Sequence, residues 1–283
     1  MKKLLLTGGT GFIGSHFLNK LAESDLEIFA IRRKKSSKPK IILKKNPYWI
    51  EKSLNELNIN DFKGIDVFVN FASAGVMPKK VCLEEILKTN ILDTTNAIEL
   101  AAKAGVKNII LAGTCYEYGE IDLINQPIKS NTFLNPENFY SASKASSFNF
   151  SKNLCKKYNL KMFYGRIFSA YGEGQFDQNL WPSIKKAAKN GDDFNLSNPE
   201  RILDFIPVEE VVNIFYNACH RKDLVPGKVC LKNIGTGKGE KIIDFVNSEW
   251  IKFKAKGKII IDNNSQKESI NNNFISDLEE KFI

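Results

Sequence analysis

The chain has 283 residues, of which 43% are hydrophobic and 26% are charged, so it can bury a full core and carry a smaller attached lobe. No apolar run reaches the roughly 20 residues that span a bilayer. The N-terminal apolar run has only three leucines before Thr7 and Gly8, which is too short for a secretory signal. The five cysteines are scattered and the chain has only two histidines, which favours a reducing cytoplasm and argues against a metal site.

The formal net charge of +9 has two interpretations. Basic chains can bind nucleic acid, but these lysines are spread along the sequence and form no block. A surface that attracts phosphorylated small molecules explains the charge equally well. We therefore expect a cytoplasmic protein with a small-molecule substrate and without a nucleic-acid or membrane partner.

In the first half, short apolar runs alternate with amphipathic stretches. The runs predicted to be strands are Lys3–Thr7, Ile28–Ile31, Val67–Phe71, Asn108–Ala112 and Met162–Phe168. The stretches predicted to be helices are Ser15–Ser24, Glu84–Ala104 and Asn138–Tyr158. Such alternation predicts an α/β protein of the Rossmann type, with a doubly wound parallel sheet between helices.

The alternation stops after Tyr171-Gly172-Glu173-Gly174. We expect a dinucleotide-binding domain over residues 1–172 and a smaller C-terminal substrate-binding lobe over 173–227 and 236–283. The strand-like run Lys228–Ile234 is predicted to rejoin the main sheet, and Leu180–Asn190 to form a helix. Asn263–Asn273 is predicted to be a loop before a last short helix.

A glycine-rich segment links the first predicted strand to the first helix. Glycines 8, 11 and 14 lack the Cβ atoms that would keep a pyrophosphate away from the backbone and from the helix N-terminus. The residues expected to contact the dinucleotide here are Gly8, Thr10, Gly11, Phe12, Ile13 and Gly14. The alternative is a turn that only joins strand to helix.

The second predicted strand ends in Arg32 and Arg33, where NAD-specific proteins carry an acid for the adenosine ribose. Guanidinium groups suit the 2′-phosphate of NADPH, so NADPH (NADP+) is predicted over NADH. The other interpretation is a solvated basic run that continues through Lys34 and Lys35.

Tyr140 and Lys144 lie four residues apart, which puts both side chains on one face of a helix. Lysine is so common here that this spacing alone means little. Its position carries more weight, because Thr114 follows the strand that precedes the helix and can meet Tyr140 at the edge of the sheet.

Three features together resemble the extended short-chain dehydrogenase/reductases, also called the NAD-dependent epimerase/dehydratase family, over about residues 1 to 245. They are the T-G-G-x-G-F-I-G loop, Thr114 five residues before Gly119, and Tyr-x-x-x-Lys. The resemblance implies that Tyr140 donates a proton and that Thr114 holds the substrate carbonyl. Lys144 would lower the pKa of Tyr140 and reach the nicotinamide ribose.

The resemblance also implies further cofactor contacts, which are Ser53, Leu54, Phe71, Ala72, Ser73 and Asn90. The segment around Ser73 could equally be a loop that leaves the strand without contacting the cofactor.

The second half resembles the 4-ketoreductases that make CDP-linked deoxysugars, such as CDP-abequose and CDP-paratose synthases. That resemblance implies substrate contacts by Thr114, Cys115, Tyr116, Ser169, Asn179, Trp181 and Arg201. Where such enzymes carry a phosphate-binding arginine, this chain has Leu203. Arg201 shares a strand face with that position and could supply the cation, or else be solvent-exposed. Trp181 could equally serve in packing.

The expected reaction is NADPH-dependent reduction of the 4-keto group of a CDP-, TDP- or GDP-linked deoxysugar in surface-polysaccharide (lipopolysaccharide) synthesis. A 4,6-dehydratase would carry an Asp-Glu pair where Cys115 and Tyr116 stand. The alternatives are an NAD-dependent epimerase and a non-catalytic nucleotide-binding relative. Family analogy implies a homodimer.

Overall fold

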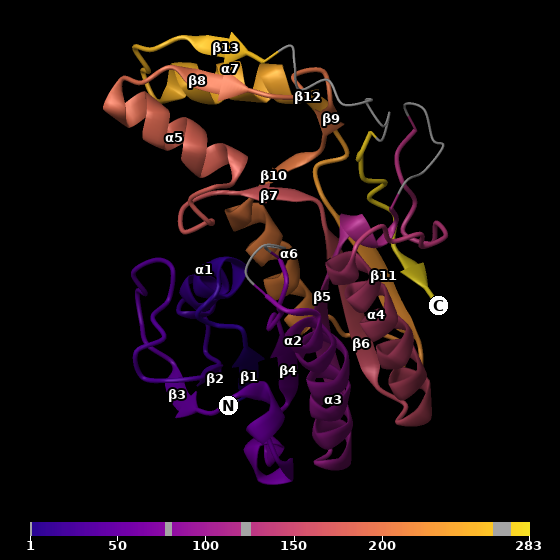
Figure 1. Cartoon of the computed structure of the whole chain (residues 1–283). Helices are drawn as coiled ribbons and strands as arrows, with labels where there is room; N and C mark the ends of the chain where they lie inside the picture. The colour runs from indigo at the N-terminus through magenta and orange to yellow at the C-terminus, as the bar shows by residue number, and fades with distance from the viewer. Residues whose placement is uncertain (1, 77–80, 120–125, 263–272) are drawn as a thin grey trace.

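The computed structural model describes residues 2–76, 81–119, 126–262 and 273–283, which build an eight-stranded central sheet (Figure 1). The strand order is β14-β11-β6-β5-β4-β1-β2-β3, and every neighbouring pair is parallel except β11 with β14. The strands are β1 (Lys3–Thr7), β2 (Glu27–Arg32), β3 (Tyr48–Glu51), β4 (Val67–Asn70), β5 (Asn108–Thr114), β6 (Lys161–Ile167), β11 (Val229–Ile234) and β14 (Lys281–Phe282). The chain winds outward from β1 in both directions, which confirms the predicted fold class.

Helices cover both faces of the sheet, because successive strand residues point to opposite sides. Leu4 and Leu6 pack with α1 (Phe12–Leu21) and α6 (Val208–His220), whereas Leu5 packs against the other layer. That layer holds α3 (Thr94–Lys103) and α4 (Phe139–Lys157), and α2 (Leu83–Leu87) and the π-helical segment η4 (Lys88–Asp93) lead into α3. The described residues of this part also form the 3-10 helices η1 (Leu54–Glu56), η2 (Ile59–Phe62) and η5 (Cys115–Glu117).

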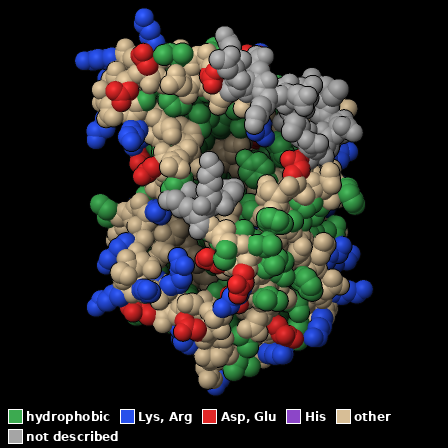
Figure 2. Space-filling view, in the orientation of Figure 1, with side chains coloured by type: hydrophobic (Ala, Val, Ile, Leu, Met, Phe, Trp, Pro, Cys, Tyr) green, Lys and Arg blue, Asp and Glu red, His purple; other side chains and the backbone are tan. Residues whose placement is uncertain are grey.

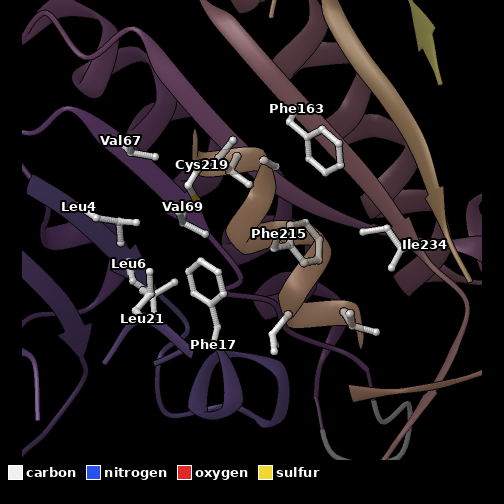
Figure 3. Close-up of a cluster of buried hydrophobic side chains, with 14 of the residues drawn as sticks. Leu4, Leu6, Phe17, Leu21, Val67, Val69, Phe163, Phe215, Cys219 and Ile234 are labelled. Carbon is white, nitrogen blue, oxygen red and sulfur yellow. The ribbon is translucent and has the colours of Figure 1, made fainter. Parts of the chain in front are cut away.

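Helix α6 packs on the sheet, although its residues fall in the range 173–227 that the sequence assigned to the lobe. Figure 3 shows Phe215 and Cys219 of α6 facing Phe17 of α1 and the strand side chains. Phe215 is fully buried, and its ring centroid lies 4.8 Å from that of Phe71. The second half of the chain therefore helps to build the core of the first.

The lobe lies beyond the carboxyl ends of the strands, at the top of Figure 1. Its elements are β7 (Ser169–Tyr171), α5 (Leu180–Asn190), β8 (Phe194–Leu196), β9 (Ile202–Leu203), β10 (Phe205–Pro207), β12 (Glu240–Lys241), α7 (Ile242–Lys252) and β13 (Ile259–Ile261). They pair as β10 with β7, β12 with β9 and β13 with β8. A separate apolar cluster, which includes Ile184 of α5 and Trp250 of α7, holds the lobe together.

Several local predictions were incomplete. The stretch Glu84–Ala104 was predicted as one helix, but the π-helical segment interrupts it. The edge strand β3 and the helices α6 and α7 were not predicted. The predicted last short helix is wrong within residues 273–283, where the chain runs extended into β14. Of the predicted loop Asn263–Asn273, residues 263–272 lie outside the described part.

Among the described residues, no helix is both long and apolar enough to cross a membrane.

Candidate functional site

The segment between β1 and α1 forms a cradle that only glycine can line. Gly8 has a φ of +76°, and a Cβ atom there would lie 2.5 Å from the backbone of Phe71 and Ala72. A Cβ atom on Gly14 would collide with the carbonyl of Gly8. Helix α1 begins after Gly11 with no acidic residue in its first turn, so its N–H groups and positive dipole end are open to an anion. This cradle fits the pyrophosphate of a dinucleotide.

Other predicted contacts lie around this cradle. Thr10, Phe12 and Ile13 belong to the loop and the first turn of α1. Ser53 caps η1, where its backbone N–H donates to Glu56 Oε2 at 2.6 Å, and Leu54 packs partly into the core.

The two arginines that end the second strand have different surroundings. Arg32 Nη2 donates to Glu51 Oε1 at 2.8 Å, across the parallel register that places Glu51 beside it. Arg33 is exposed and forms no ion pair with any described residue. The charge of Arg32, on which the prediction of NADPH rested, is therefore already compensated within the protein.

Thr114, Tyr140 and Lys144 gather around one buried carboxylate, that of Glu117. Glu117 Oε1 accepts the backbone N–H of Thr114 at 2.9 Å and the hydroxyl of Tyr164 at 2.8 Å. The Tyr164 hydroxyl also lies 3.4 Å from the carbonyl oxygen of Lys144, which ties α4 to the end of β5. Thr114 and Lys144 are thus joined to the Glu117 network through their backbone atoms, and the Glu117 charge also acts on Tyr140.

Glu117 was not among the residues predicted to form the site. The carboxylate is fully buried, and its Oε2 accepts from Arg166 Nε at 2.7 Å. Arg166 also donates to the Tyr118 hydroxyl and to the Ser130 carbonyl. The available signal was an acid three residues after Thr114 together with an arginine inside an otherwise apolar strand. Both need a partner when buried.

Burial controls the charge states of the two central side chains. Burial raises the pKa of Tyr140, and the neighbouring Glu117 charge raises it further, while the Ser73 hydroxyl opposes the shift. Burial lowers the pKa of Lys144, and Glu117 opposes that change. Both groups are thereby pushed toward their neutral forms in the free protein.

The π-helical segment η4 places the buried side-chain amide of Asn90 against helix α4. Asn90 Nδ2 donates to the Ser143 hydroxyl at 2.8 Å and to the Ala74 carbonyl at 2.9 Å, and its Oδ1 accepts from Ser73. Ser143 in turn donates to the carbonyl of Tyr140. Asn90 therefore links the loop at Ser73 and Ala74 to helix α4, and the predicted contacts of this loop with the nicotinamide stay a prediction.

The predicted substrate residues fall into two groups. Tyr116 is 46% exposed, and its ring contacts Phe274 with the centroids 5.8 Å apart. The guanidinium carbon of Arg201 lies 5.9 Å from the centre of the same Phe274 ring. Leu203 instead packs against apolar clusters. Arg201 precedes β9 and is exposed, so the prediction that it replaces the phosphate-binding arginine stays a prediction.

Cys115 and Trp181 both make packing contacts in the structure. The Cys115 thiol is 2% exposed within an apolar cluster, and burial raises its pKa to about 12, so it serves as apolar packing. Trp181 donates from Nε1 to Glu249 and packs against Phe253, which matches the packing alternative. Cys115 packs in the cluster that also holds Phe274, and Trp181 packs between α5 and α7.

Ser169 and Asn179 lie at the base of the lobe. Ser169 begins β7, and Asn179 is the residue before α5. Figure 2 shows a hollow between the lobe and the sheet domain.

These features define a Rossmann-fold protein with a dinucleotide cradle and a Thr-Tyr-Lys site at the same edge of the sheet. The model of the NAD dependent epimerase/dehydratase family matches residues 4–235, and the chain belongs to that family.

Named relatives are distant. UDP-arabinose 4-epimerase 1 of Arabidopsis thaliana is 23% identical over 87% of this chain and 66% of its own length. The dTDP-D-glucose 4,6-dehydratase of Dictyostelium discoideum is 26% identical over 75% of this chain and 55% of its own length. The chain thus spans less than two thirds of these two proteins.

Solved structures share the fold closely. MoeE5, in complex with UDP-glucuronic acid and NAD, superposes with a TM-score of 0.81 at 23% identity, covering 98% of this chain and 90% of that one. UDP-glucose 4-epimerase of Thermotoga maritima, with UDP-glucose, gives a TM-score of 0.83 at 22% identity and the same coverage. These relatives are not named as 4-ketoreductases, so the finer resemblance stays a prediction.

Proposed function

We propose that this chain is an NAD-dependent epimerase that inverts C4 of a nucleotide-linked sugar. The observation that carries the proposal is the grouping of Thr114, Tyr140 and Lys144 around Glu117, beside a glycine cradle that suits a pyrophosphate. The names of the relatives, several of them UDP-sugar 4-epimerases, support it. This was the alternative of the sequence analysis, and it now takes precedence over 4-keto reduction.

The chain's own residues fit a proton relay at C4. A bound nicotinamide cofactor would accept the C4 hydride and return it. Tyr140 takes the proton of the C4 hydroxyl and gives it back, while the Thr114 hydroxyl donates a hydrogen bond to that oxygen. Lys144 favours the ionised form of Tyr140. Inversion requires the keto sugar to turn its other face before the hydride returns.

Dehydration is disfavoured by the residues after Thr114. Removing water across a C–C bond needs an acid and a base besides the relay, and carboxylates are the usual choice. Cys115 is a buried thiol, and Tyr116 carries a phenol. Neither supplies a carboxylate.

Arg201 is the proposed contact for the nucleotide phosphates. It is exposed and lies where its charge reaches Tyr116, so it can meet an anionic ligand at the mouth of the site.

The second candidate is NADPH-dependent reduction of a nucleotide-linked 4-keto-deoxysugar in surface-polysaccharide synthesis. Arg33 favours it, since this exposed guanidinium at the end of β2 is free to meet a 2′-phosphate.

One experiment separates the two. The purified protein is mixed with UDP-glucose, UDP-galactose or UDP-arabinose without added cofactor, and the sugars are followed by NMR. We expect interconversion at C4, and NAD released on denaturation. Consumption of one NADPH per 4-keto-6-deoxysugar, with no interconversion, would instead establish the reductase. Tyr140→Phe is the inactive control, with a loss of about 10²–10⁴-fold.

A further inference from the structure

The ion pair between Arg32 and Glu51 occupies the place where a Rossmann fold reads the adenosine ribose. The carboxyl end of the second strand faces that ribose, and an acidic residue there normally accepts hydrogen bonds from the ribose hydroxyl groups. Here the second strand supplies a cation, and the acid comes from the neighbouring strand β3. Parallel register sets Glu51 opposite Arg32.

The guanidinium of Arg32 is held in position. Nη2 lies 2.8 Å from Glu51 Oε1, and the guanidinium carbon lies 5.2 Å from the centre of the Trp49 ring. The Arg32 side chain is 13% exposed, whereas that of Glu51 is 47% exposed. The backbone N–H of Lys52 also donates to the Arg32 carbonyl at 3.0 Å, which fixes the two strand ends together.

The pair offers a ligand both a donor and an acceptor. Among the described residues, Glu51 uses one oxygen for Arg32, and its Oε2 has no hydrogen-bond partner. A ribose hydroxyl can donate to that oxygen and accept from the guanidinium. A 2′-phosphate has only acceptors at neutral pH and carries close to two negative charges, so Glu51 repels it and competes for Arg32.

We infer that the Arg32–Glu51 pair selects NAD(H) over NADP(H), with Glu51 serving as the ribose acceptor that the second strand lacks. The inference rests on the dinucleotide site of the proposed function and names the group that sets its specificity.

The test measures nucleotide binding alone. Wild-type protein freed of nucleotide, Glu51→Gln and the double variant Arg32→Gln/Glu51→Gln are titrated with NAD+ and with NADP+ by calorimetry. Glu51→Gln should weaken NAD+ and tighten NADP+ by about tenfold each, the size of one charged hydrogen bond. The double variant should lose the gain for NADP+. Glu27→Gln removes an acid from the far end of β2 and should change neither affinity.

Two results overturn the inference: wild-type protein that prefers NADP+, or a Glu51→Gln variant with the wild-type ratio of affinities. Melting temperatures check that the variants fold, which is expected because exposed ion pairs contribute little to stability. Since no sugar is present, a failure of 4-epimerisation leaves this ratio untouched, and the two failures can be told apart.

Discussion

Glu117 connects the candidate site to the buried side chains beneath the site. It accepts from the backbone of Thr114 and pairs with Arg166, and both charged side chains are almost completely buried. Taking two charges from water is costly, so such a pair is stable only while every partner is present. The network therefore links the position of Thr114 to the packing beneath it.

Glu117→Gln should destabilise the fold strongly, because its amide presents a donor to the Arg166 donor and leaves a buried guanidinium unpaired. We expect a loss of about 3–5 kcal/mol in the free energy of unfolding, measured with urea. Glu23→Gln breaks an exposed pair with Lys44 and should leave the midpoint unchanged. Equal effects of the two variants would contradict this account.

The opposite pKa shifts of Tyr140 and Lys144 predict a pH dependence. Because the pKa of Tyr140 is raised, its ionised form is scarce at neutral pH, and activity should increase as the pH rises. Removing the cation in Lys144→Met should move this rising limb to higher pH by about one unit or more. Because the pKa of Lys144 is lowered, its cation is itself lost as the pH rises, which should limit the increase in wild-type activity at alkaline pH.

Lys152→Met, an exposed lysine on the same helix, should retain the wild-type pH profile. A Lys144→Met profile that falls in amplitude without moving would argue for a role of Lys144 in binding alone.

At the scale of elements, α6 decides whether the sheet has a complete core. Its apolar face meets β1, β4 and β6 on the side of α1 (Figure 3). Phe215 is central, since it contacts the rings of both Phe71 and Phe163.

Phe215→Ala should cost about 3–5 kcal/mol of unfolding free energy, from lost burial and the cavity that remains. Chemical denaturation measures it. Phe133→Ala, at a side chain that is 84% exposed, should change stability by less than about 0.5 kcal/mol. A small effect at Phe215 would mean that α6 is not part of the cooperative core.

At the scale of the whole molecule, the layer of α3 and α4 carries an apolar surface. Figure 2 shows hydrophobic side chains gathered over this layer. Leu87 at the end of α2, Leu92 of η4 and Phe150 of α4 are 43%, 65% and 54% exposed. Exposed apolar patches of this kind commonly mark interfaces. The family resemblance makes a second copy of the chain the proposed partner.

Light scattering coupled to gel filtration should therefore give about twice the chain mass of 32.0 kDa. The variant Leu92→Glu/Phe150→Glu should run as a monomer, because two charges would be buried without partners. Ile251→Glu, at a side chain 77% exposed on α7, should stay dimeric. A monomeric wild type would remove the dimer from the proposal.

The sequence by itself indicated the fold class, most strands of the sheet and the candidate residues of the site. Apolar runs, glycine positions and the Tyr-x-x-x-Lys spacing are local patterns, and the strand Lys3–Thr7 and the helix Leu180–Asn190 match the structure to the residue. Local patterns also placed Thr114 and Tyr140 at neighbouring strand and helix ends.

Only the tertiary structure decided what depends on contacts between distant segments. Pairing of β2 with β3 turned Arg32 from a free cation into the partner of Glu51, 19 residues away. Pairing of β5 with β6 buried Glu117 against Arg166, and the return of α6 completed the core. The charge state and burial of a side chain depend on residues that are distant in the sequence, so local patterns do not predict them. The glycine loop depends on its own backbone, so the sequence could predict it.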